Sequence, residues 1–168
     1  MSDECTEWIL ECREAFPKLD RFTITSEYKK LGKNVLGRVK GQVERYRDIK
    51  PKSIFLDGEV KFSTKTKEEH SYQIFINEKL KKVEPDNFRK QVIQNIMTHE
   101  LLHIENKDLT TLSKKYSRRM KKKIHVSDFH KECLDRFNQI RKINNINPIK
   151  SYDQLKEAES KIATKLKI

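Results

Sequence analysis

The sequence predicts a single α+β domain in which the strands come first and the helices follow. All four glycines, together with short alternating runs of β-branched residues, fall between residues 21 and 78. After Pro85 the apolar residues recur at the helical period of about 3.6 residues. A length of 168 residues is enough for one domain with a real core.

The first half is predicted to be one helix followed by strands. Residues 3–16 form an amphipathic pattern that ends at Pro17 and places Cys5 and Cys12 in the core. Short strands are expected over 22–25, 34–39, 53–56, 60–62 and 70–77, with Asp57-Gly58 as the turn of a hairpin. The expected product is a small, mostly antiparallel sheet. His70 lies in a polar run and is interpreted as a solvated residue at a strand edge.

The second half is predicted to be helical. The longest helix is expected after Asp86 as its N-cap, ends at residues 106–108, and is apolar enough to be the central helix packed against the sheet. A second helix is expected after Asp108 as its N-cap, and a third from Ser127 to about Asn144. Residues 151–166 give a final helix with a weak apolar signal. We therefore expect one domain over 1–150 and a C-terminal helix over 151–168 that could be loosely attached.

The composition favours a polyanionic partner. The net charge is +12, from 37 Lys plus Arg against 25 Asp plus Glu, and such an excess favours nucleic acid. The alternative is that the charge serves solubility and stability, as in many Lys-rich chains. Three cysteines without a CxxC pair indicate reduced thiols. With no leader and no long apolar run, we expect a cytoplasmic protein without a membrane partner, associated with the nucleoid if it binds DNA.

The segment His99-Glu100-Leu101-Leu102-His103 is an HExxH motif on the predicted central helix. Residues four apart lie on one face of a helix, so the two imidazoles can bind one metal ion while Glu100 handles a proton. The alternative is two core histidines whose ring nitrogens are satisfied by neighbours. Left unpaired, such buried nitrogens would cost several kcal/mol. The motif therefore predicts one Zn²⁺ per chain.

A catalytic zinc needs a third protein ligand and an open coordination position. The extended motif with a third histidine six residues after His103 is absent. The preferred candidate is His125, which lies just before the expected cap Ser127. His130 and a downstream carboxylate such as Glu132 are the alternatives.

The segment His125-Val126-Ser127-Asp128-Phe129 resembles the third-ligand H-x-x-x-F segment of SprT-like zinc metallopeptidases, and YgjP/WLM-type peptidases carry a similar one. Residues 31–38 and 72–80 are similar to two further segments of that superfamily, so that the resemblance spans roughly residues 20–143. It implies a minimal zincin-like domain that acts on protein or peptide. Val126 replaces the usual glycine, and no cysteine cluster follows.

The predicted reaction is hydrolysis of peptide bonds by metal-activated water, with Glu100 as the general base. Tyr116, Arg118 and His130 are the candidates for a second oxyanion donor. Some SprT-like proteases cleave proteins crosslinked to DNA, so the resemblance also implies DNA association. The predicted contacts are the cations of a basic run, which is otherwise a solvated helical face: Lys114, Lys115, Arg118, Arg119, Lys121, Lys122 and Lys123.

Two other functions are consistent with the same residues. One is a non-enzymatic, basic nucleic-acid-binding protein whose metal is structural, with Glu132 or His130 as a fourth ligand. The other is a metal-dependent hydrolase that acts on a substrate other than protein.

Overall fold

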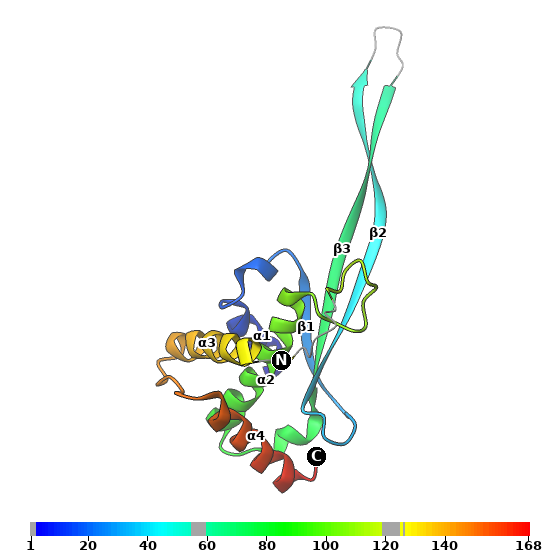
Figure 1. Ribbon diagram of the computed structural model, residues 1–168. Helices are drawn as coiled ribbons and strands as arrows, with labels where there is room; N and C mark the ends of the chain where they lie inside the picture. The colour runs from blue at the N-terminus through cyan, green and yellow to red at the C-terminus, as the bar shows by residue number, and fades with distance from the viewer. Residues whose placement is uncertain (1–2, 55–59, 119–124, 126) are drawn as a thin grey trace.

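A computed structural model describes residues 3–54, 60–118, 125 and 127–168. In this part of the chain a three-stranded sheet packs with four α-helices, which confirms the α+β class (Figure 1). Along the chain, α1 (Glu4–Arg13) and a short 3₁₀ turn precede the strands, and α2 (Asp86–Asn106), α3 (Ser127–Ile143) and α4 (Tyr152–Leu166) follow them. No helix of the described residues is long and apolar enough to cross a membrane.

The sheet has the order β1-β3-β2. Strand β1 (Thr23–Lys29) runs parallel to β3 (Val60–Asn77), and β2 (Gly37–Ile54) runs antiparallel to it. The sheet is therefore mixed, and the prediction of a mostly antiparallel sheet holds for the long β2–β3 pairing alone. Strand β2 occupies one edge of β3, so β1 pairs with the opposite edge. There β1 runs in the same direction as β3.

The hairpin is much longer than the sequence predicted. Each of its strands has 18 residues, and the single register shift lies between Pro51 and Ser53. The expected strands over 60–62 and 70–77 are parts of this hairpin, as are residues 37–39 and 53–54 of the strands expected over 34–39 and 53–56. Residues 34–36 precede β2 and are not strand. Residues 55–56 and the expected Asp57-Gly58 turn lie outside the described residues. The prediction missed residues 40–52 and 63–69 because both segments are mostly polar. No alternation of apolar and polar residues therefore marks them as strands.

Helix α2 confirms the predicted central helix, but Pro85 is its N-cap and the expected cap Asp86 is its first residue. Its side chains Ile93, Met97, Leu101 and Leu102 are fully or nearly fully buried, and the sheet, α1 and α3 pack around them. The thiols of Cys5, Cys12 and Cys133 are free and buried, as expected for Cys5 and Cys12. The helix ends at Lys107, whose φ of 54° is left-handed.

The helix expected after Asp108 is wrong over the described residues, because 109–118 form turns and bends. Asp108 does not cap a helix; its carboxylate bonds a histidine ring of α2. Further along, the backbone N–H groups of Tyr116 and Ser117 both donate to the Ser113 carbonyl. Residues 119–124 and 126 lie outside the described part of the chain. We refer to residues 107–118 as the α2–α3 loop.

Candidate metal centre

Three histidine side chains converge at the C-terminal half of α2. His99 and His103 lie one helical turn apart, and His125 reaches them from just before α3. Their Nε2 atoms are 3.2 Å (His99–His103), 3.1 Å (His99–His125) and 3.0 Å (His103–His125) apart. The structure thus brings together all three predicted ligands, close enough to bind one metal ion.

The nitrogen geometry fits a metal ion better than a hydrogen-bonded cluster. A tetrahedral site with metal–nitrogen bonds of about 2.0–2.1 Å places its nitrogen ligands about 3.3 Å apart, close to the observed separations. A hydrogen bond between two imidazole nitrogens uses one proton, and three nitrogens that point at one centre cannot all satisfy one another in this way. A cation bound by all three nitrogens would resolve this conflict.

Asp108 holds His103 from behind. The Nδ1 of His103 lies 2.7 Å from Asp108 Oδ1, and both side chains are 12% exposed. An Nδ1–H that donates to this carboxylate leaves the Nε2 lone pair free for a metal, the arrangement typical of metal-binding histidines. The left-handed Lys107 turns the chain back to make this contact. The signal in the sequence was an acid directly after a helix end and five residues beyond the second histidine.

Phe129 packs against all three imidazoles. Its ring centroid lies 5.1 Å from His99, 4.7 Å from His103 and 5.1 Å from His125, and the side chain is buried. Burial lowers the pKa of His99 to about 3, with the neighbouring histidines adding to the effect. Burial also lowers the pKa of His125. Both rings are therefore neutral near pH 7, as metal ligation requires.

Glu100 lies beside the histidines in a nearly dry position. Its side chain is buried, and burial raises its pKa to about 7. Strand β2 passes close to it: a Cβ at Gly37 would overlap Ile96 Cγ2 and lie 3.5 Å from Glu100 Oε1. Glycine at 37 therefore allows β2 to approach this turn of α2. A carboxyl with a pKa near 7 can both accept and release a proton at neutral pH.

A cleft of about 420 Å³ opens in front of the histidines. One wall comes from residues 34–37, which lead into β2, and another comes from α4 through Tyr152, Lys156 and Glu159. Helix α4 is anchored there, because Leu155 is buried and Glu159 accepts a hydrogen bond of 2.5 Å from Asn95 Nδ2 of α2. The weak apolar signal of 151–166 gave no indication that this helix contributes to the site.

The other candidate ligands lie elsewhere. The His130 ring stacks on Tyr152 with centroids 4.4 Å apart and lines the cleft without joining the three-histidine cluster. Glu132 pairs with Arg136 at 3.7 Å. Among the described residues, the cluster therefore offers three histidine nitrogens to a metal ion. Of the three candidate oxyanion donors, His130 lines this cleft, whereas Tyr116 lines a different cavity and donates to Glu68 at 2.6 Å.

The predicted basic contact surface is described in part. Lys114, Lys115 and Arg118 are exposed, but they lie in the α2–α3 loop and not on a helix. Lys115 bonds Glu68 at 3.2 Å. The other predicted contacts, Arg119, Lys121, Lys122 and Lys123, lie outside the described residues.

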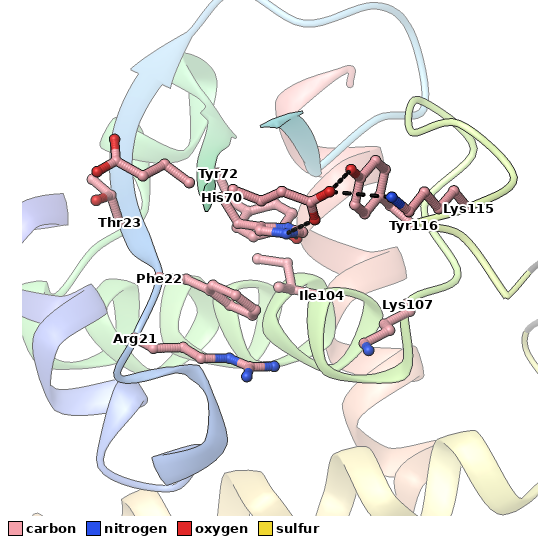
Figure 2. A pocket seen from close by; sticks show the side chains of 11 residues that line it. Arg21, Phe22, Thr23, His70, Tyr72, Ile104, Lys107, Lys115 and Tyr116 are labelled. Carbon is pink, nitrogen blue, oxygen red and sulfur yellow. Dashed lines mark hydrogen bonds and ion pairs between the residues drawn. The ribbon is translucent and has the colours of Figure 1, made fainter. Parts of the chain in front are cut away.

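A second cavity of about 580 Å³ lies between β3, the start of β1 and the α2–α3 loop (Figure 2). The rings of Phe22 and Tyr116 pack on His70 with centroids 5.1 and 5.2 Å away, and His70 Nδ1 is 3.2 Å from the Tyr72 hydroxyl. Burial lowers the pKa of His70. The interpretation of His70 as a solvated strand-edge residue is therefore corrected: it lies on the middle strand of the sheet.

Three converging imidazoles, a carboxyl beside them and an adjoining cleft can hold a divalent cation and move a proton next to it. No family model, no curated protein and no solved structure matches the chain.

Proposed function

We propose that the protein is a zinc-dependent peptidase of the SprT-like type, with His99, His103 and His125 as metal ligands. The observation that supports this most is the convergence of three Nε2 atoms with Glu100 beside them. Three histidines and an open position are a common catalytic zinc environment. When bound there, zinc would lower the pKa of a water to about 7 and polarise a substrate carbonyl.

The side chains around the cluster have distinct roles in this proposal. Glu100 accepts the proton of the attacking water and then delivers it to the leaving amine, which its pKa of about 7 suits at neutral pH. Asp108 fixes the orientation of the His103 ring, and Phe129 packs against the three histidine rings and holds them in place. The start of β2 is a sheet edge beside the cleft, and an extended peptide could bind it by strand addition.

A structural metal is the competing function. It requires a fourth protein ligand that closes the coordination sphere. The two residues considered for that role are engaged elsewhere, His130 with Tyr152 and Glu132 with Arg136. This favours a site with an open position. Association with DNA belongs to the proposal as well, supported by the net charge of +12 and the exposed Lys114, Lys115 and Arg118.

The test compares the wild type with Glu100→Gln for metal content and for cleavage of casein and histones, with and without DNA. We expect Glu100→Gln to retain one zinc per chain and to lose cleavage by a factor of about 10² or more, because it keeps the ligands but removes the base. Glu132→Gln, which changes an acid on α3 outside the cleft, is the matched control and should cleave normally.

Cleavage by Glu100→Gln at the wild-type rate would remove this residue as the base. A wild type that holds zinc but cleaves no protein, with or without DNA, would instead favour the structural metal or a non-protein substrate. His125→Ala tests the third ligand separately: unchanged zinc affinity would remove His125 from the ligand set.

A further inference from the structure

The outer part of the β2–β3 hairpin projects far from the rest of the protein (Figure 1). We call residues 46–54 and 60–67 the arm. At about 3.4 Å per residue, an 18-residue strand is about 60 Å long, so the hairpin extends well past the helices. A two-stranded ribbon without further packing is only marginally stable in water. The length of the hairpin is therefore better explained by binding to a partner than by a contribution to the stability of the fold.

Large apolar side chains stand exposed on this arm. Ile49 is 60% exposed, Phe62 61% and Tyr46 43%, and together they are half of the exposed large hydrophobic residues among those described. Apolar groups gathered on a projecting element are typical of a contact surface. They indicate that something covers the arm.

The charges of the arm favour a polyanion. Its described side chains include four cations, Arg47, Lys50, Lys65 and Lys67, and one acid, Asp48, which already bonds Lys67 at 2.6 Å and Lys50 at 3.8 Å. Arg47 and Lys65 form no ion pair within the described residues. Residues opposite each other in an antiparallel pair share a face, so the register places Arg47 on one face and Lys65 on the other. The ribbon thus presents cations on both faces.

A ribbon with cations on both faces matches the major groove of duplex DNA. That groove is about 12 Å wide, admits a two-stranded β-ribbon, and has a phosphate backbone along each side. The major groove of duplex RNA is too narrow for side chains to enter. We infer that the arm binds duplex DNA in the major groove, with Arg47 and Lys65 contacting phosphates on the two sides and Phe62 contacting the groove. This inference deepens the DNA association included in the proposed function, but it does not depend on peptidase activity.

The test measures binding of the full chain to a labelled DNA duplex of about 30 bp by fluorescence anisotropy, over about 50–200 mM NaCl. The arm variant is Arg47→Glu/Lys65→Glu. The matched control is Lys142→Glu/Lys150→Glu, which changes the net charge equally at exposed positions in and after α3. We expect the arm variant to bind at least about tenfold more weakly and to lower the slope of log affinity against log salt by about two, with little change in the control.

Phe62→Ala separates apolar contact from charge. It should weaken binding several-fold and leave the salt slope unchanged. Zinc content and casein cleavage without DNA, measured on every variant, show whether a loss of DNA binding is independent of the metal centre. Circular dichroism shows whether each variant is folded.

Several results would overturn the inference. Equal losses in the arm variant and its control would mean that the whole positive surface attracts DNA diffusely. Tighter binding to single-stranded DNA or duplex RNA would contradict the groove assignment. Absence of binding at about 100 mM NaCl, or a dimer of the wild type that the arm substitutions dissociate, would assign the arm to another partner.

Discussion

The two halves of the β2–β3 hairpin share their strands but differ in what stabilises them. In the base, residues 37–45 and 68–77, Ile74 and Ile76 are fully buried against the helices. In the arm, Ile49 of β2 and Phe62 of β3 share one face of the ribbon and remain about 60% exposed. Strand pairing is therefore common to both halves, whereas burial depends on whether helices pack against the strands.

The two parts of the hairpin therefore have different roles in the molecule. The base is fixed by the core and brings Gly37 beside Glu100, so it can hold the residues of the candidate metal centre in place. The arm contributes little burial to folding, so its residues are free to serve a partner. Three substitution experiments test this contrast.

The largest effect is expected from a matched pair of truncations in the two halves. Ile76→Ala should lower the free energy of unfolding by about 2–5 kcal/mol, because it leaves a cavity in the core. Ile49→Ala removes the same atoms from an exposed position and should change it by no more than about 0.5 kcal/mol. Urea denaturation measures both. A loss above about 1 kcal/mol for Ile49→Ala would show that the arm packs on the protein itself.

A smaller effect is expected at the metal centre from Asp108, in the α2–α3 loop that packs on the base. Asp108→Asn should weaken zinc affinity by about 10–100-fold, since it removes the charged acceptor of the His103 Nδ1–H. Asp48→Asn makes the same chemical change on the arm, where Asp48 bonds Lys67, and should leave zinc affinity unchanged. Competition with a chromophoric chelator measures both. Equal affinities for the wild type and Asp108→Asn would mean that the ring of His103 is held by its packing alone.

The sequence predicted the elements that have a local signal. The HExxH spacing located His99, Glu100 and His103, because residues four apart share a helix face wherever the helix lies. The third ligand, His125, was ranked first from its place before a helix cap and from a family resemblance. Helices over 86–106 and 127–143 were found from their apolar period.

The missed features depend on contacts distant in the sequence or on polar residues. Asp108 and Asn95–Glu159 act through side-chain bonds that no local pattern encodes. The helix expected after Asp108 satisfied the helical period, but Lys115 and Tyr116 bond Glu68 on β3, which is 47 and 48 residues away, respectively. Tertiary contacts overrode a marginal propensity there. The arm was missed because its strands pack against no core. Their sequences therefore lack the alternation of apolar and polar residues that predicts a strand.

The smallest effect on stability is expected at His70, which lies in the base close to its boundary with the arm. Burial lowers its pKa, with Arg21 before β1 and Lys107 after α2 acting in the same direction and Glu68 on its own strand opposing them. The unfolded chain therefore takes up a proton near pH 6.5 that the folded protein resists, so stability should fall as the pH drops below about 6.5. His70→Gln should reduce this dependence. Thermal unfolding of the wild type and His70→Gln between about pH 7.5 and 5 isolates the contribution, since titration of the metal ligands is common to both. Identical pH dependence of thermal unfolding in the two proteins would show that His70 is as solvated as an arm residue. His70 would then belong to the arm, and the base would begin closer to Asn77.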